Sequence, residues 1–283
     1  MMKLSLCNEV LQPMPLAEQC AFASALGYDG LEIAPMTLAA NPLTLTPNEL
    51  REIRRTVEGE GLEVTSLHYI TLAPSGINIT ALDQPTVAFT RDALLRLVDL
   101  AEALGAKVMV HGSPQQRRID GDSAAQRAQA VQHFQAAGEH AEKAGIAYCV
   151  EAINSRECNF INRIEDAQSI IDEAGSTALK LMLDVSHAAQ EEPEGLCAVA
   201  ERLLAQDKLA HVQLNAINRQ GPGQSNDPMK RDAIPPFLKV LKAGGYSGAL
   251  AMEPFEYHPD GRASAARSIG YVRGVLDALA QLE

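Results

Sequence analysis

The stretch Gly145-Ile-Ala-Tyr-Cys-Val-Glu151 shows the unit from which this chain is built: a glycine, a short apolar run and a closing polar residue. Similar runs recur along the chain, most of them after an amphipathic segment that ends near a glycine. The eight runs begin at Lys3, Gly27, Gly61, Gly105, Gly145, Leu179, Leu209 and Tyr246. Most successive starts lie roughly 30 to 45 residues apart, the length of a strand, a crossover helix and two loops. The pattern predicts eight βα units, and therefore one α/β domain over residues 1–283, a closed (β/α)8 TIM barrel.

The segments between these runs have the spacing of helices. Leu94, Leu97 and Leu104 recur at helical intervals, with Thr90 as the expected N-cap. Other helices are expected at about 15–27, 46–60, 122–143, 163–174, 195–206, 232–243 and 262–281. A doubly wound open sheet has the same alternation, but no G-x-G-x-x-G follows the first predicted strand. Long loops at 71–85, 113–122 and 215–230 each follow a strand, the side of a barrel where active sites lie.

Composition limits the class of protein. With 46% hydrophobic and 21% charged residues, the chain can bury a large core, which excludes a fibrous or disordered protein. A net charge of −12 would repel a phosphate backbone, so no nucleic-acid partner is expected. No apolar run approaches a bilayer span and the first residues lack a secretory signal, so we expect a cytoplasmic protein without a membrane partner. The five cysteines are scattered, which favours reduced thiols over disulfides.

Polar residues close the predicted strands. They are Asn8 or Glu9, Glu32, His68, His111, Glu151, Asp184, Gln213 and Glu253. Because parallel strands end on one rim of a barrel, these side chains are expected to converge on one cavity. Each residue alone is equally well explained as a polar group bonded to a loop, but the whole set favours a functional site.

The acidic members of this set indicate a metal. Carboxylates near an apolar interior need a cation or a shared proton. Glu151, Asp184 and Glu253, with the carboxamide of Gln213, form an oxygen-rich set that suits Mn²⁺ or Mg²⁺ better than Zn²⁺. We therefore predict one divalent ion, Mn²⁺ or Mg²⁺, at the mouth of the barrel.

Four motifs in the second half of the chain carry a family resemblance. They are Glu151-Ala-Ile-Asn-Ser-Arg-Glu157, Asp184-Val-Ser-His187, Ala216-Ile-Asn-Arg219 with Gly221-Pro-Gly223, and Met252-Glu253-Pro-Phe255. The chain resembles the xylose isomerase-like TIM barrel superfamily (sugar phosphate isomerase/epimerase family), especially ketose 3-epimerases of the tagatose and psicose type and hydroxypyruvate isomerases. The resemblance implies metal ligation by Glu151, Asp184 and Glu253. It implies substrate contacts by Glu157, His187 and Arg219.

The seventh strand departs from the epimerase pattern. Family epimerases carry His-x-His there, with the second His as ligand, whereas this chain has His211-Val-Gln213. Strand alternation places both residues on one face, so either can reach inward. Hydroxypyruvate isomerases are similar to this chain at this point, because they place Gln at the ligand position. We predict Gln213 as the ligand, with His211 one layer deeper.

The two glutamates are the predicted catalytic pair. A metal-bound carbonyl acidifies the neighbouring C–H and stabilises an enediolate, so Glu151 and Glu253 on opposite faces can remove and return a proton. Arg219 is alternatively a solvated loop charge, and Glu157 alternatively pairs with Arg156 or Arg163. His68 and His111 are predicted substrate contacts, with a core histidine as the alternative for either.

These residues favour a metal-dependent epimerase or isomerase of a small unphosphorylated ketose or hydroxy-keto compound. The alternatives are a hydroxypyruvate isomerase-like aldose–ketose isomerase, a lyase resembling inosose dehydratase, and a non-catalytic binding barrel. An endonuclease of the abasic-site type would need three zinc ions, more histidines and a basic groove. The sequence offers none of these features, which argues against that class. By analogy with the family, a homo-oligomer, a dimer or tetramer, is expected.

Overall fold

In the computed structural model, which describes residues 2–281, eight parallel strands close into one barrel in chain order. The strands are β1 (Lys3–Cys7), β2 (Gly30–Ile33), β3 (Glu63–Leu67), β4 (Val108–His111), β5 (Ala147–Val150), β6 (Leu179–Asp184), β7 (Leu209–Leu214) and β8 (Ala249–Met252). β1 pairs with β8 as well as with β2, which closes the sheet. The predicted (β/α)8 barrel is confirmed; the extent of the single domain, 1–283, stays a prediction.

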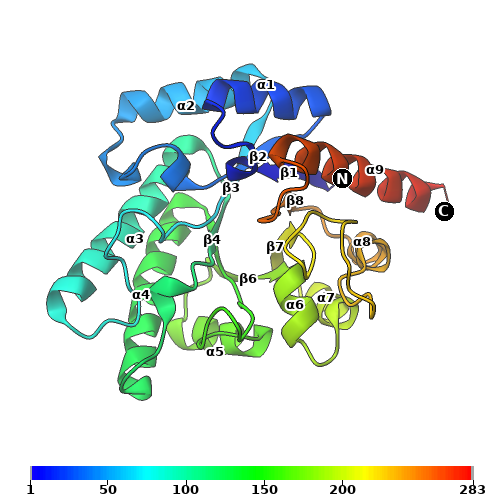
Figure 1. Cartoon of the computed structure of the whole chain (residues 1–283). Helices are drawn as coiled ribbons and strands as arrows, with labels where there is room; N and C mark the ends of the chain where they lie inside the picture. The colour runs from blue at the N-terminus through cyan, green and yellow to red at the C-terminus, as the bar shows by residue number, and fades with distance from the viewer. Residues whose placement is uncertain (1, 282–283) are drawn as a thin grey trace.

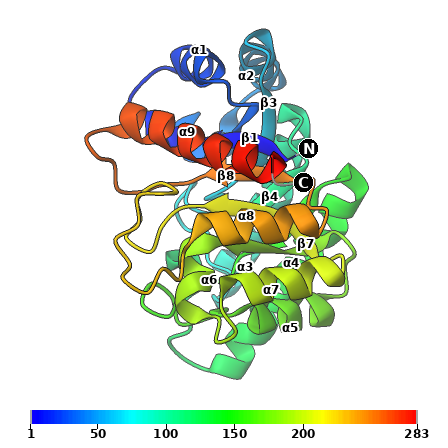
Figure 2. The same ribbon diagram turned by 90° about the vertical axis from the view of Figure 1, so that its right-hand side faces the viewer.

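Helices form a ring around these strands (Figure 1), and the view from the side shows them packed along the barrel wall (Figure 2). They are α1 (Leu16–Leu26), α2 (Pro47–Gly59), α3 (Gln84–Leu104), α4 (Ser123–Ala144), α5 (Ile164–Ala174), α6 (Val185–Glu191), α7 (Leu196–Ala205), α8 (Ile234–Ala243) and α9 (Gly261–Ala280). Short 3₁₀ turns follow several strands, including η1 (Asn8–Leu11) and η4 (Gln115–Arg117). No helix among the described residues is long and apolar enough to cross a bilayer.

Two helices differ from the sequence prediction. α3 begins six residues before Thr90, because Asp83 caps it by accepting a hydrogen bond from the Thr86 amide at 3.0 Å. Thr90 lies buried inside the helix and bonds Asn78 instead. The short helix α6 was not expected; it starts directly after β6, with Asp184 as its N-cap.

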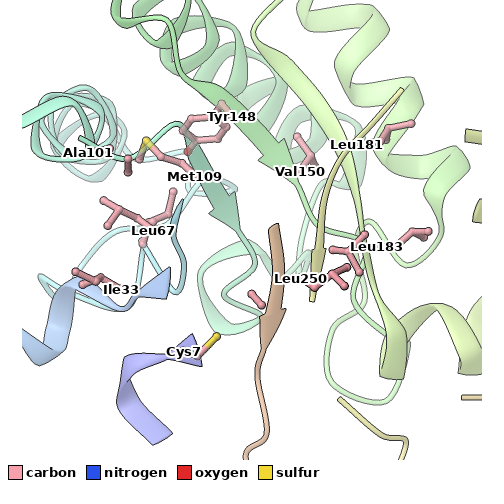
Figure 3. Packing of buried hydrophobic residues seen from close by; sticks show 14 of the residues in the cluster. Cys7, Ile33, Leu67, Ala101, Met109, Tyr148, Val150, Leu181, Leu183 and Leu250 are labelled. Atoms are coloured by element: carbon pink, nitrogen blue, oxygen red, sulfur yellow. The ribbon is translucent and has the colours of Figure 1, made fainter. Parts of the chain in front are cut away.

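The main hydrophobic core lies between the strands and the helical ring. Leu67 and Met109 from neighbouring strands, with Ala101 from α3, are fully buried there (Figure 3). Alternation along each strand then turns the intervening residues into the barrel. In β7, Val212 and Leu214 belong to this outer core, so His211 and Gln213 face the interior. The interior is polar just below the rim, and this layer supports the site.

Candidate active site

The carboxyl ends of the strands surround one cavity that is partly open to solvent. Its lining residues are His68, Tyr69, Val110, Gly112, Pro114, Glu151, Glu157, His187, Arg219, Glu253 and Phe255. Six of the predicted site residues therefore lie around one small space, although they come from five different strand ends and loops.

Glu151 and Glu253 follow β5 and β8 and are both 5% exposed. Burial raises the pKa of the Glu151 carboxyl well above its ordinary value, and the nearby charges of Glu253 and Asp184 add to the effect. Burial also raises the pKa of Glu253 to about 8, although His68 opposes the shift. Negative charge is therefore unfavourable at both carboxyls unless a cation shares the cavity.

Asp184 is held by its neighbours in a fixed orientation. Oδ1 accepts a hydrogen bond from the His187 amide at 2.8 Å, and Oδ2 accepts one from Asn215 Nδ2 at 2.6 Å. The same Asn215 nitrogen lies 3.3 Å from Glu253 Oε2, and Asn215 Oδ1 accepts from the Ser186 amide. Asn215 thus bridges two predicted ligands. The sequence analysis missed this residue, although it lies two positions after Gln213 on the same face.

Gln213 and His211 occupy two successive layers of the interior. Gln213 Nε2 donates to Glu32 Oε1 at 2.8 Å and to Glu253 Oε1 at 3.1 Å, while its own Oε1 is buried without a partner. His211 lies deeper, with Nε2 2.7 Å from Glu32 Oε2. Burial opposes ionisation of Glu32, but the charge and hydrogen bond of His211 outweigh it and hold the pKa of that carboxyl far below its usual range. This placement favours Gln213 as the metal ligand, because its side-chain oxygen has no partner and His211 lies deeper, against Glu32.

His68 and His111 have different environments. His68 lines the cavity, with Nδ1 3.0 Å from Glu253 Oε1 and Nε2 2.9 Å from Glu9 Oε2. Burial opposes protonation of His68, but the two carboxylates outweigh it and raise its pKa well above the ordinary value. Both ring nitrogens are therefore engaged by protein groups, and the structure favours a role in orienting Glu253.

His111 is a core residue in this structure. It is fully buried and absent from the cavity lining; its Nδ1 lies 2.8 Å from the Tyr148 hydroxyl and its ring packs on Phe134. Of the two interpretations given above, the structure therefore places His111 with the core histidines. Its side chain points away from the site because it lies one residue before Gly112, on the opposite face of the strand end.

His187 faces Glu151 from the first turn of α6. Asn154 Nδ2 donates to His187 Nδ1 at 2.8 Å and to Glu157 Oε1 at 2.9 Å. Burial lowers the pKa of His187, so the ring is neutral and carries its proton on Nε2, which lies 3.6 Å from Glu151 Oε1. Glu157 forms no ion pair with Arg156 or Arg163 among the contacts of the described chain. Its carboxylate instead lines the cavity.

Arg219 points into the cavity from the loop after β7. Its guanidinium lies over the Phe255 ring at 4.1 Å from the centroid, and one terminal nitrogen, Nη1, is buried without a partner. Arg219 also has a positive φ of 63°, and its carbonyl accepts hydrogen bonds from the Phe255 and Glu256 amides at 2.8 Å. Backbone strain of this kind is common at binding sites. The placement fits a donor to substrate better than a solvated charge.

The loop after β4 does not present a pair of arginines to an anion. Arg117 is fully buried and donates to the backbone carbonyls of Glu151, at 2.6 Å, and of His111. Arg118 points outward and donates to the Glu157 carbonyl at 3.3 Å. Arg117 thus joins the ends of two neighbouring strands.

The residues at the rim fit a divalent cation. Ligand atoms of Glu151, Asp184 and His187 lie within 4.8 Å of one another, and Glu253 belongs to a second such group with Cys7, Glu9 and His68. Gln213 lies against Glu253 through its amide nitrogen, and its Oε1 has no partner. Carboxylate and carboxamide oxygens are the donors that Mn²⁺ and Mg²⁺ prefer. A cation would also offset the charge that burial disfavours on Glu151 and Glu253.

Comparison with known proteins agrees with this geometry. The model of the xylose isomerase-like TIM barrel family matches residues 20–275. The chain belongs to this family. It is 31% identical to a D-psicose 3-epimerase of Enterocloster bolteae over 82% of this chain and 74% of that protein. It is 26% identical to a D-psicose 3-epimerase of Ruminiclostridium cellulolyticum over 81% of this chain and 75% of that one. The protein is thus an enzyme of the isomerase class, like these epimerases.

Solved structures with the same fold include further epimerases. The D-psicose 3-epimerase of Clostridium cellulolyticum crystallised with D-tagatose superimposes with a TM-score of 0.81 and 20% identity, over 97% of this chain and 99% of that one. An L-ribulose 3-epimerase gives a TM-score of 0.81 and 19% identity, over 99% and 96%. At these identities the similarity establishes the barrel, and the site residues must be argued from their own geometry.

Proposed function

We propose that this enzyme is a metal-dependent epimerase of an unphosphorylated ketose, in which Glu151 and Glu253 exchange the proton on the carbon next to the carbonyl. The observation that carries the proposal is the pair of buried carboxyls, from different strand ends, in one cavity, each with a raised pKa. One carboxylate takes the proton from one face of the substrate and the other returns a proton to the opposite face. The configuration at that carbon inverts, with no net change in composition.

Other side chains of the cavity are proposed to hold the substrate. His187 Nε2 and the free nitrogen of Arg219 are donors for its oxygens, and Glu157 is an acceptor for a hydroxyl. His68 holds Glu253 in place through the 3.0 Å contact. Arg219 is the one Arg or Lys side chain among the described lining residues, which favours a substrate without a phosphate group.

The proposed metal is Mn²⁺ or Mg²⁺, held by Glu151, Asp184, Gln213 and Glu253. When bound, such an ion polarises the carbonyl and makes the neighbouring hydrogen more acidic. The orphaned Oε1 of Gln213 and the crowded carboxyls support this ligand set.

Deuterium exchange tests the function. The purified enzyme is incubated with Mn²⁺ and a panel of ketoses in heavy water, and products are followed by NMR. We expect an epimer with deuterium at the carbon next to the carbonyl. Glu151→Gln and Glu253→Gln should each slow exchange by about 10² to 10⁴-fold. Glu139→Gln, on the exposed side of α4, is the control and should exchange at the wild-type rate.

Other products would replace the proposal. Absence of deuterium uptake with every sugar contradicts proton transfer at this carbon. An aldose product indicates a hydroxypyruvate isomerase-like reaction, the alternative that Gln213 favours. An unsaturated keto product, visible by ultraviolet absorbance, indicates a dehydratase-like lyase.

We also propose a homo-oligomer in the cytoplasm that binds neither nucleic acid nor membrane. The net charge of −12 supports the exclusion of nucleic acid. Sedimentation analysis of the purified protein tests the oligomer, and a monomer at micromolar concentration would contradict it.

A further inference from the structure

A hydrogen bond between Glu32 and Gln213 crosses the interior of this barrel. Glu32 lies on β2 and Gln213 on β7, two strands that are not neighbours in the closed sheet. The Gln213 side chain nevertheless donates to Glu32 Oε1 at 2.8 Å, and both residues are completely buried. β7 is therefore tied through the barrel interior to a strand that is not its neighbour.

Glu32 is held in place by three further contacts. Cys7 Sγ donates to Oε1 at 3.1 Å, Ser66 Oγ donates to Oε2 at 2.5 Å, and His211 Nε2 lies 2.7 Å from Oε2. These three partners come from β1, β3 and β7. A carboxylate with donors on both oxygens can act only as an acceptor toward Gln213.

The position of Glu32 determines which end of the Gln213 amide meets the neighbouring carboxylates. The amide nitrogen has two hydrogens, and it meets two carboxylate oxygens, those of Glu32 and Glu253. Rotating the amide by 180° would place Oε1 against both negative oxygens, which is repulsive. Gln213 Oε1 is consequently left buried with no partner. A buried acceptor without a partner lowers the stability of the metal-free fold, and the oxygen remains available for a cation.

Glu253 alone does not fix this orientation. Its Oε1 is shared with His68, its Oε2 with Asn215, and the proposed function assigns it to the metal and to proton transfer. Glu32 does not line the cavity and has no part in the proposed reaction, so it can accept the hydrogen bond from Gln213 at every stage.

We propose that Glu32 is a positioning residue that orients the Gln213 carboxamide so that its oxygen faces the metal. The inference rests on the proposed function, since it concerns one of the proposed ligands. It also explains how a carboxamide on β7 can act as a metal ligand. An amide can point either its nitrogen or its oxygen toward the metal, and the hydrogen bond from Nε2 to Glu32 leaves the oxygen free for that role.

The test is Mn²⁺ affinity, measured by electron paramagnetic resonance of the free ion. In Glu32→Gln, the new amide can donate to Gln213 Oε1 and favour the reversed orientation. We expect the Kd for Mn²⁺ to rise about tenfold to a hundredfold, the usual effect of removing a group that orients a ligand. At saturating Mn²⁺ the activity should largely recover, because Glu32 does not line the cavity.

Two variants serve as controls. Ser66→Ala removes the donor to the other oxygen of Glu32 and leaves Gln213 untouched, so its Mn²⁺ affinity should stay within about twofold of wild type. Glu32→Asp keeps the negative charge near His211 but withdraws the acceptor from Gln213, and it should weaken binding even if Glu32→Gln does not fold.

The outcomes separate this inference from the function. Wild-type affinity in both Glu32 variants overturns the positioning role and leaves the proposed function standing. No Mn²⁺ binding by the wild type overturns both. A crystal structure of the wild type with Mn²⁺ gives an independent check: Gln213 Oε1 should contact the ion while Nε2 stays on Glu32, and the reverse arrangement contradicts the inference.

Discussion

Gly112 lies directly after β4 and against the side chain of Glu151. A Cβ atom at position 112 would overlap Glu151 Oε2, while the backbone of Gly112 itself needs no positive φ. Since the overlapping atom is the end of a flexible side chain, Gly112→Ala should fold but displace the Glu151 carboxylate. A displacement of about 1 Å can reduce a rate by about 10²-fold, so we expect a loss of that order in kcat.

Gly270 is the matched control for this substitution. It lies on the exposed face of α9 with open space around its Cβ position. Gly270→Ala should leave kcat unchanged and stabilise the fold by about 0.5–1 kcal/mol, as measured by urea unfolding. Equal activity of the two variants would show that Gly112 does not set the position of Glu151.

His133 on α4 makes stability depend on pH. His133 is 2% exposed, its Nε2 has no partner, and burial lowers its pKa to about 4, helped by the charge of Arg91. The unfolded chain takes up this proton below about pH 6.5, so the folded state loses stability as the pH falls from there toward 4. Between pH 7 and pH 5 this histidine should account for about 2 kcal/mol of lost unfolding free energy at most.

Urea unfolding at pH 7 and pH 5 measures this effect. His133→Gln should lose less stability than the wild type over that interval. Gln132, next to His133 on α4, is exposed and does not titrate, so Gln132→Ala is the control and should keep the wild-type pH dependence. If His133→Gln and the wild type lose the same free energy, the buried ring is not the cause.

At the scale of elements, Arg117 joins the ends of β4 and β5. Its guanidinium donates to the Glu151 and His111 carbonyls, and its Nε is buried without a partner. Hydrogen bonds from charged groups contribute about 1.5–3 kcal/mol each, so Arg117→Met should lower the free energy of unfolding by about 2–4 kcal/mol. Arg118→Met, on the exposed neighbour, should change it by less than about 0.5 kcal/mol. Similar values for the two variants in chemical unfolding would contradict the role of Arg117.

The sequence predicted elements better than their contacts. The runs predicted to begin at Leu179 and Leu209 start at the first residues of β6 and β7, and Asp184, predicted to close the sixth strand, is the last residue of β6. The start of α3 was wrong, since Thr90 and Asp83 are both acceptable caps and only the packing of Thr90 on Asn78 excludes it. Local pattern decides whether an element exists, and tertiary contacts decide its limits.

Contacts between side chains that are far apart in the chain could not be predicted from the sequence. Gln213 was predicted to face inward from strand alternation, but nothing in the chain links it to Glu32, which is 181 positions away and on a strand that is not its neighbour. The burial of Arg117 could not be expected from the sequence either, because a buried guanidinium without an acidic partner is rare. In both cases the closed barrel supplies the acceptors, and only the assembled structure shows them.

The whole molecule stabilises a cluster of charges that its own fold disfavours. A closed barrel with a continuous core holds Glu151, Asp184 and Glu253 within one buried site, and charge on two of these carboxyls is opposed by burial and by their neighbours. We therefore expect the core to supply most of the free energy of unfolding and the rim carboxyls to lower it, as is common where function requires an unfavourable site. A bound cation should recover part of that loss.

Thermal unfolding with and without Mn²⁺ tests this balance. Binding to the folded state alone adds about 2.7 kcal/mol when the ion is at a hundred times its Kd, so the wild-type Tm should rise and fall back on chelation. Glu151→Gln removes one crowded charge, so it should be at least as stable as the wild type without metal and should gain less from Mn²⁺. If Mn²⁺ shifts the Tm of both proteins equally, the ion binds elsewhere. If it shifts neither, the rim carboxyls must be stabilised by shared protons rather than by a metal.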